Sequence, residues 1–250
     1  MATPTAVNLW TVRDHLAADR AGTLRRLADL GYDAVEPYEA TDDPAGLRAI
    51  ADDLGLAVCS AHSHELLGAD DPDAVFEAVN TLGTDLVIVP YGLLEEAFAG
   101  RDALARTAAT LNSLAEGAAR HGLVLGYHNY WWEFESEIDG RHAAEVLADL
   151  LAPEVFFEID DYWAALGGAD VPGVVTRLGE RVRALHLKDG PIAKGAAHTA
   201  LGRGEMPTAR ILAAAPAAAL RIVELQTCDG DVFEALAESR AFLDSQADPS

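Results

Sequence analysis

The chain has 250 residues, half of them hydrophobic, so it can bury a substantial core and shows no sign of disorder. Its formal net charge of −23, from 41 acidic and 18 basic residues, opposes binding to nucleic acid or to an anionic membrane surface. Two cysteines, Cys59 and Cys228, are too few for a disulfide framework. Because neither an apolar leader nor an apolar run of membrane-spanning length is present, we expect a cytoplasmic protein.

Short apolar, β-branched runs alternate with helical stretches along the chain. The expected strands are, in chain order, Ala6–Trp10, Ala34–Pro37, Leu56–Ala61, Leu86–Pro90, Leu123–His128, Val155–Asp160, Val182–Leu187 and Arg221–Leu225. Between them apolar residues recur with a period of roughly 3.6, which predicts helices such as Ala103–Arg120 and Ala143–Leu150. Several of these helices are expected to end at a glycine just before the next strand, at Gly31, Gly55, Gly83 and Gly122.

This alternation predicts a single (β/α)₈ barrel, the TIM barrel, spanning residues 1–250. Near-continuous apolar strands between helices indicate a parallel sheet that is covered on its faces, and eight such units close a barrel. A doubly wound open sheet is the alternative, but no glycine-rich phosphate turn follows the first strand. No linker divides the chain, and its longest irregular segment, Gly190–Glu205, falls where a barrel places a loop over its active face.

Titratable side chains gather at the ends of the predicted strands, which form the catalytic face of such a barrel. These residues are Glu36, His62, His64, His128, Asp160, His186 and Glu224. Asp160, His186 and Glu224 close three consecutive strands, so the fold would bring them together. Buried groups of this kind need a common partner, and we therefore expect a shared metal ion.

The expected metal is a hard or borderline divalent cation. Carboxylate oxygens with one imidazole and no thiolate suit Mn²⁺, which we expect first, and also Mg²⁺, Co²⁺, Fe²⁺ or Zn²⁺. Such an ion can grip two oxygens of a sugar, polarise its carbonyl and stabilise an enediolate, while a neighbouring carboxylate moves the proton. The residues therefore predict proton-transfer chemistry on a sugar or similar polyol.

Six segments carry a resemblance to a known family. They are Leu9-Trp10-Thr11-Val12-Arg13-Asp14, Gly31-Tyr32-Asp33-Ala34-Val35-Glu36, Tyr127-His128-Asn129-Tyr130-Trp131-Trp132-Glu133-Phe134, Ile159-Asp160-Asp161-Tyr162-Trp163, Leu185-His186-Leu187-Lys188-Asp189 and Leu201-Gly202-Arg203-Gly204-Glu205. Over nearly its whole length the chain resembles the xylose-isomerase-like barrels, usually labelled sugar phosphate isomerase/epimerase. That family also includes inosose dehydratases, ketose 3-epimerases and dehydroshikimate dehydratases.

The resemblance implies a metal held by a Glu, an Asp, a His and a Glu from the fifth to eighth strands. Three of these ligands map onto Asp160, His186 and Glu224. Many relatives carry the first Glu where this chain has Gly126. Glu133 or His128 would then supply the fourth ligand, and we favour Glu133 because the most similar subfamily has a Glu there, in a His-Asn-His-x-x-Glu-Phe run. The alternative for Glu133 is a salt bridge at the rim.

The resemblance also implies the acid and base. In epimerase-like relatives, metal-bound glutamates on opposite sides of the substrate exchange its proton. Glu224 is therefore the expected base, with Glu133 or His128 as its counterpart. Tyr130 replaces the second His of the run, which leaves the exact reaction open.

Further side chains are expected around the substrate. Lys188 would neutralise a developing oxyanion, or else pair with Asp189 at the rim. His62 and Arg13 would orient the substrate from the barrel mouth. The other candidates are Glu36 and His64, which would bind substrate or support the residues that do, and the aromatic residues Trp131 and Trp163, which with Tyr130, Trp132 and Tyr162 would stack on a sugar or fill the core.

The expected function is that of a metal-dependent isomerase or epimerase acting on an unphosphorylated sugar or polyol. A dehydratase or lyase acting on a keto-sugar or cyclitol would use the same site. A barrel that binds a polyol or a partner protein without turnover is the non-catalytic alternative. A metal-dependent AP endonuclease needs a basic DNA groove, which the net charge opposes. The number of subunits stays open, a homo-oligomer included.

Overall fold

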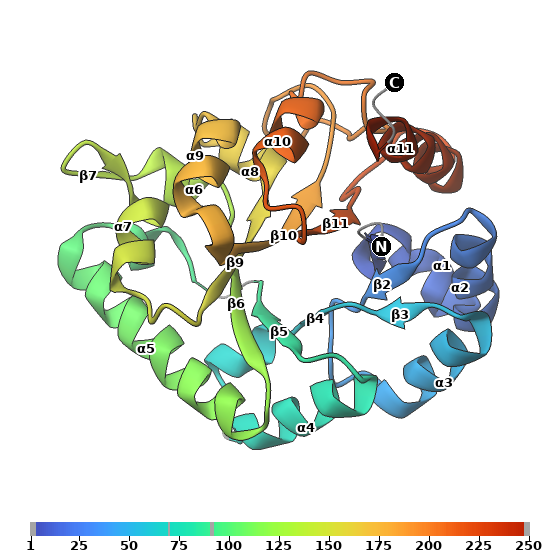
Figure 1. The fold of residues 1–250 in the computed structure, drawn as a ribbon, viewed down its shortest axis with the longest axis horizontal. Helices are drawn as coiled ribbons and strands as arrows, with labels where there is room; N and C mark the ends of the chain where they lie inside the picture. Colours follow the sequence, from blue (N-terminus) through green and yellow to red (C-terminus); the bar gives the residue numbers. More distant parts are fainter. Residues whose placement is uncertain (1–3, 70, 91–92, 248–250) are drawn as a thin grey trace.

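A computed structural model describes residues 4–69, 71–90 and 93–247. Within them a sheet of nine strand segments winds into a barrel, and every pairing between its segments is parallel (Figure 1). The segments are β1 (Thr5–Asn8), β2 (Ala34–Glu36), β3 (Ala57–Val58), β4 (Ala61–His62), β5 (Leu86–Val89), β6 (Val124–His128), β9 (Phe156–Asp160), β10 (Val182–Leu187) and β11 (Leu220–Val223). Their order in the sheet is β3-β2-β1-β11-β10-β9-β6-β5-β4.

The two outer members of this order, β3 and β4, are halves of one interrupted strand. Cys59 and Ser60 part them, and the Cys59 amide still donates to the carbonyl of Val35 on β2 (3.1 Å). β3 pairs with β2 and β4 pairs with β5, so this strand closes the ring. The nine segments therefore make eight strands, and the predicted (β/α)₈ barrel is confirmed.

Helices surround the sheet on its outer side (Figure 1). The longer ones are α2 (Arg20–Asp29), α3 (Pro44–Leu54), α4 (Pro72–Leu82), α5 (Arg101–Arg120), α7 (Ala143–Leu150), α9 (Val171–Leu178), α10 (Thr208–Ala214) and α11 (Val232–Ala247). Shorter elements are the single turns η1 (Leu9–Val12), η2 (His64–Leu67), η3 (Glu95–Phe98) and η4 (Gly179–Arg181), helices α1 (Arg13–Ala18), α6 (Trp132–Glu135) and α8 (Asp161–Leu166), and the hairpin β7 (Glu137–Ile138) with β8 (Arg141–His142). As expected, α3 and α4 end at glycines with positive φ, Gly55 (71°) and Gly83 (81°). No helix in the described ranges is both long and apolar enough to cross a membrane.

The first strand ends two residues earlier than the apolar run predicts. The Asn8 side chain accepts a hydrogen bond from the Trp10 amide (2.9 Å), which caps η1 and turns the chain out of the sheet. Trp10 is thereby placed on the rim of the barrel.

Inside the barrel, side chains are apolar towards the amino ends of the strands and polar at their carboxyl ends, where the barrel has its mouth. The apolar part contains Ala6, Ala34, Ala184 and Ile222 on one side and Leu86, Ile88 and Phe156 on the other. Since side chains alternate along a strand, the next inward-facing positions lie two residues further on. Those positions include Asn8, Glu36, His186, Glu224 and Glu158, all of them buried. The strands thus deliver a layer of polar side chains at their carboxyl ends.

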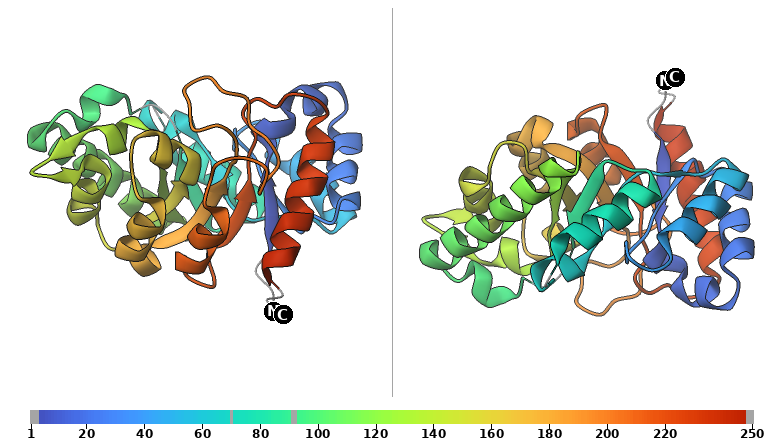
Figure 2. Two further views of the ribbon diagram at one scale, coloured as in Figure 1. Left: turned by 90° about the horizontal axis from the view of Figure 1, so that it is seen from above. Right: turned by 90° about the horizontal axis from the view of Figure 1, so that it is seen from below.

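A long loop follows β10 at this same end. Figure 2 shows it in orange, at the end of the barrel opposite to the one where β1 begins. It includes the segment Gly190–Glu205 that was predicted to be irregular. The buried carboxylate of Asp189 accepts from the amides of Gly190 (2.8 Å), Gly202 (2.8 Å) and Met206 (3.0 Å), which fixes both ends of the loop.

Candidate active site

Glu36 anchors the polar layer. Its carboxylate accepts hydrogen bonds from Asn8 Nδ2 (2.8 Å) and Ser60 Oγ (2.6 Å), and it contacts His186 Nε2 (2.6 Å). These contacts orient the imidazole so that His186 Nδ1 faces Glu224 Oε2 at 2.8 Å. Glu36 therefore orients the His186 ring from inside the barrel. Glu36 itself does not line the cavity, although it was predicted to bind substrate.

Both ring nitrogens of His186 contact carboxylates. Burial alone would lower the pKa of this histidine, but Glu158 and Glu36 outweigh that effect and hold the pKa well above its usual value. Without a metal the side chain is therefore an imidazolium. A metal ion binding at Nδ1 has to displace that proton.

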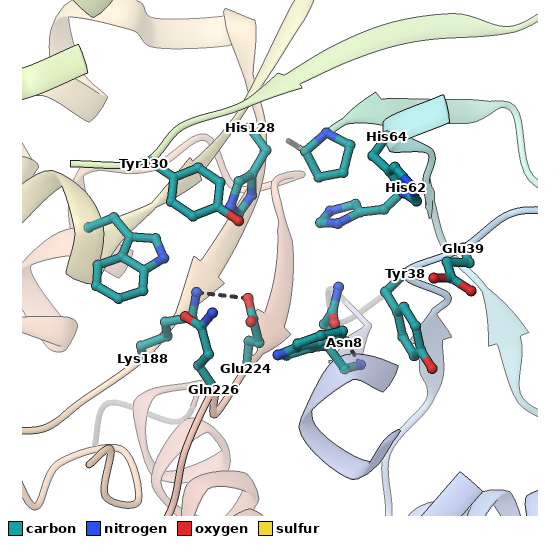
Figure 3. Close-up of a pocket in the computed structure, with 13 residues that line it drawn as sticks. Asn8, Tyr38, Glu39, His62, His64, His128, Tyr130, Lys188, Glu224 and Gln226 are labelled. Carbon is teal, nitrogen blue, oxygen red and sulfur yellow. Dashed lines mark hydrogen bonds and ion pairs between the residues drawn. The ribbon is translucent and has the colours of Figure 1, made fainter. Parts of the chain in front are cut away.

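Asp160, His186 and Glu224 converge, as their positions at three consecutive strand ends suggested. Each offers one ligand atom, and these atoms lie within 4.8 Å of one another. The Lys188 ammonium reaches the same place, where it contacts Asp160 Oδ2 and Glu224 Oε2, the latter at 2.8 Å (Figure 3). Burial would lower the pKa of Lys188, but the two carboxylates outweigh it and hold the pKa above its usual value. The cluster accommodates a positive charge between its carboxylates.

A second cluster lies beside the first and centres on Glu158. Its Oε2 is 2.6 Å from His62 Nε2, 2.8 Å from His128 Nδ1 and 3.3 Å from His186 Nε2. Burial raises the pKa of Glu158, but His186 and His62 outweigh it and hold the pKa well below its usual value. Its other oxygen, Oε1, is buried without a hydrogen-bond partner among the described residues.

Asn8, Ser60 and Glu158 were not among the predicted site residues. Glu158 could have been found, because it precedes Asp160 by two positions and alternate residues of a strand share a face. Asn8 lies at the end of a strand that was predicted to run on to Trp10, and Ser60 lies in the interruption between β3 and β4. No sequence pattern identifies Asn8 or Ser60 as a site residue.

His128 presents one nitrogen to the mouth. Its Nδ1 faces the Glu158 carboxylate and therefore carries the hydrogen, which leaves Nε2 as the acceptor, 3.6 Å from Asp160 Oδ2. Burial lowers the pKa of His128, so the ring is neutral near pH 7. Nε2 can then accept a proton from a bound molecule.

Glu133 is not brought to either cluster. Helix α6 carries it, and its carboxylate accepts from Tyr127 Oη (2.5 Å) and from the Tyr130 amide (3.0 and 3.1 Å). Burial raises the pKa of Glu133 to about 7. The arrangement lends no support to the expectation that Glu133 completes the metal site, and it is also not the rim salt bridge of the alternative interpretation.

The fifth strand has no room for a ligand at Gly126. A Cβ built on this glycine would meet the Phe156 ring at 2.3 Å, so the aromatic ring occupies the space of a side chain. Gly126 therefore adds no ligand. One group of candidate ligands comes from the ends of the sixth, seventh and eighth strands (Asp160, His186 and Glu224), and His128 of the fifth strand belongs to a second group, with His62, Glu158 and His186.

The cavity above these clusters has a volume of about 380 Å³. Its lining comprises Asn8, Trp10, Tyr38, Glu39, His62, His64, Pro90, His128, Tyr130, Trp163, Lys188, Glu224 and Gln226. Figure 3 shows His62, His128, Lys188 and Glu224 pointing into it from different strands. Of the predicted substrate-binding residues, His62 and Trp163 line this cavity, with His64 exposed at its edge.

Arg13 and Trp131 lie elsewhere. The Arg13 guanidinium stacks on Trp10 (4.5 Å to the ring centroid) and donates to the carbonyl oxygens of Trp10 (2.8 Å) and Gln226 (3.3 Å). It lines a different cavity, beside the start of α11. Trp131 packs against Trp132 and Trp163, with ring centroids 4.7 and 5.2 Å apart. Neither residue lines the cavity above the clusters.

The residues at the mouth fit a divalent metal. Carboxylate oxygens and an imidazole nitrogen form the donor set of Asp160, Glu224 and His186. The unpartnered Glu158 Oε1 beside them is a buried acceptor of the kind that a cation or a metal-bound water satisfies. Asp160 Oδ1 accepts from the Trp163 amide (2.9 Å), which orients its other oxygen towards the cluster.

Replacing Glu158 with glutamine tests its part in this arrangement. The change keeps the shape but removes the charge that holds His62 and His128, and we expect affinity for Mn²⁺, measured by calorimetry, to fall roughly 10- to 100-fold with the fold intact. Glu154→Gln, an exposed site four residues earlier, is the matched control. Affinity equal to that of the control would show that Glu158 does not support the cluster.

Comparison with known proteins finds one matching family model and several solved structures with the same fold. The family model described as xylose isomerase-like TIM barrel matches residues 24–245. Three solved structures share the fold: a sugar phosphate isomerase/epimerase from Parabacteroides distasonis (23% identity, TM-score 0.78, covering 100% of this chain and 96% of that one), a probable 3-DHS dehydratase from Bacillus anthracis (11%, 0.75, 97% and 99%), and a xylose isomerase-like TIM barrel protein from Mycobacterium smegmatis in complex with magnesium (17%, 0.72, 99% and 98%). No curated protein sequence matches significantly.

Proposed function

We propose that this chain, which belongs to the xylose isomerase-like TIM barrel family, is a divalent-metal-dependent isomerase or epimerase that acts on a sugar or polyol by proton transfer. The observation that carries the proposal is the convergence of Asp160, His186 and Glu224 beside a cavity that also contains a neutral imidazole and an ammonium. Mn²⁺ is the metal we expect first, and Mg²⁺ agrees with the complex of the Mycobacterium smegmatis protein.

Asp160, His186 and Glu224 would hold the metal, which when bound would polarise a substrate carbonyl and acidify the adjacent C–H bond. The Glu224 carboxylate takes that proton, since Lys188 and His186 keep its pKa well below the usual value despite burial and so keep it ionised. Lys188 Nζ, already at the mouth, donates to the oxygen on which negative charge develops.

His128 is the proposed counterpart of Glu224. Its Nε2 accepts a proton from a substrate hydroxyl and, once protonated in this way, can deliver a proton to carbon on the other face of the substrate. The structure favours His128 over Glu133 for this role because His128 lines the cavity, whereas Glu133 is engaged by Tyr127 and by the Tyr130 amide.

A dehydratase or lyase is the second candidate. The same base would abstract the proton, and loss of a β-hydroxyl would follow. Its supporting observation is the Lys188 ammonium, a donor at the mouth that can assist a departing oxygen.

We also propose that the protein is located in the cytoplasm. Its two cysteines, Cys59 and Cys228, are free thiols, which agrees with a reducing compartment.

Proton exchange in D₂O tests the proposal. Metal-loaded protein is incubated with a panel of aldoses, ketoses, keto-sugars and cyclitols and followed by NMR. We expect deuterium to enter at the carbon next to the carbonyl, and EDTA to abolish exchange and lower the melting temperature. Exchange without loss of water identifies the isomerase or epimerase, and loss of water identifies the lyase. Absence of bound metal and of any EDTA effect would refute the proposal.

A further inference from the structure

The cavity over the site has aromatic side chains on two of its walls. Its volume of about 380 Å³ lies within the range of roughly 300–1,000 Å³ that encloses drug-sized ligands. Trp10 and Tyr38 form one wall, in an edge-to-face pair with ring centroids 5.3 Å apart. Tyr130 and Trp163 form another, nearly parallel at 6.1 Å. All four rings are only partly buried, although Tyr130 is also stacked on Trp132 (ring centroids 4.6 Å apart), so each wall presents part of its aromatic surface to the cavity.

The two walls stand on opposite sides of the polar clusters. Figure 3 shows Tyr130 on one side and Tyr38 on the other, with Glu224, His62 and His128 between them and Lys188 below Tyr130. Aromatic walls stem from the first and second strands on one side and from the fifth and sixth on the other. A ligand whose polar end reaches the clusters therefore passes between aromatic surfaces on its way out.

The charge of the lining argues against a phosphate. Lys188 is the one lysine or arginine among the described lining residues, and both Asp160 and Glu224 already contact its ammonium. The two lining carboxylates, Glu39 and Glu224, repel a second anion. Arg13, the nearest guanidinium in sequence to this wall, is directed at two backbone carbonyls instead.

We infer that the substrate joins a neutral, carbonyl-bearing polyol to a planar apolar group, as the aryl glycoside of a keto-sugar does; simple aryl glycosides, which lack the carbonyl, serve as binding probes. The inference rests on the proposed function for the polyol end, which lies at Glu224, Lys188 and His128. The planar group lies between the aromatic walls, where ring contacts and exclusion of water stabilise it.

Matched pairs of glycosides test this inference. Methyl and phenyl glycosides of D-glucose, D-galactose and D-xylose are titrated into metal-loaded protein, with quenching of tryptophan fluorescence and calorimetry as readouts. We expect the phenyl member to bind at least about tenfold more tightly in at least one pair, because it buries additional apolar area. Glucose 6-phosphate and galactose 6-phosphate should bind more weakly than the corresponding free sugars.

Two variants locate the effect. Tyr38→Leu should reduce the phenyl preference several-fold while metal content is unchanged, because Tyr38 contacts no residue of the metal cluster in the structure. Phe242→Leu, on α11 and outside the cavity, is the matched aromatic control and should leave the preference unchanged. A phenyl preference that Tyr38→Leu leaves intact would overturn the assignment to these walls.

The inference and the proposed function fail separately. If free sugars exchange deuterium but no phenyl glycoside binds more tightly than its methyl partner, the inference is overturned and the enzyme remains. If no glycoside binds at all, the inference is likewise overturned. If phenyl glycosides bind preferentially but the protein binds no metal and exchanges no deuterium, the inferred class of ligand stands and the proposed reaction is refuted.

Discussion

Under the proposed function, Asp160→Asn protein is expected to be purified without a bound divalent metal and without activity. The substitution preserves the size of the side chain but removes one of the two proposed anionic ligands. It also leaves the Lys188 ammonium with a single carboxylate partner, Glu224. His186→Ala should have the same consequence because it deletes the only nitrogen ligand of the cluster. We expect metal content to fall at least tenfold in both variants, measured by elemental analysis after dialysis.

The asparagine variant is the cleaner of the two. His186 also contacts Glu36 and Glu158, so its removal takes one contact from each of these buried carboxylates and lowers stability as well. Asp170→Asn, at an exposed position before α9, is the matched control and should keep its metal. Full metal content in the Asp160→Asn protein, with an unchanged response of the melting temperature to EDTA, would exclude Asp160 as a ligand.

Metal affinity should also fall as the pH is lowered. The pKa of His186 in the metal-free protein is held well above its usual value, so the ion competes with a proton throughout the range below that raised pKa. Binding should therefore release protons, which calorimetry in buffers of different ionisation enthalpy detects for the same wild-type protein.

The barrel was predictable because its signal repeats. Each strand is a short apolar run and each helix has its own periodicity, so an error of a few residues at one element leaves the topology unchanged. The trio of Asp160, His186 and Glu224 was predictable for the same reason, since strand ends meet at one face of a barrel.

The remaining site residues depend on information that a linear pattern does not hold. Glu158 lies inside an apolar strand, and only its phase relative to Asp160 marks it as inward-facing. Glu133 follows His128 closely in sequence, but the chain turns into α6 before reaching it, and Tyr127 and the Tyr130 amide take up its carboxylate. Arg13 begins a helix beyond the rim, where carbonyl oxygens hold its guanidinium. In these two cases local contacts, absent from the sequence pattern, determine where the side chain points.

Glu224→Gln should separate proton transfer from metal binding. The amide oxygen of glutamine can still contact a cation, so the protein should retain part of its metal, whereas an amide cannot accept the substrate proton. Loss of a general base costs roughly 10²–10⁴ in rate, and we expect deuterium exchange to fall by at least the lower of these factors. Exchange and metal content are measured on the same preparation, so that the rate is expressed per bound metal.

The chain offers a control in the same cavity. Glu39 is an exposed glutamate that lines the cavity but belongs to neither cluster of candidate metal ligands, so Glu39→Gln makes the same chemical change without touching the proposed base. Its exchange rate should stay within a few-fold of wild type, as is usual for surface substitutions. If the Glu224→Gln protein exchanges deuterium as fast as the Glu39→Gln protein at equal metal occupancy, the proton is removed elsewhere. His128 Nε2 would then be the proposed base. It lines the same cavity as Glu224, and it lies 3.6 Å from Asp160 Oδ2.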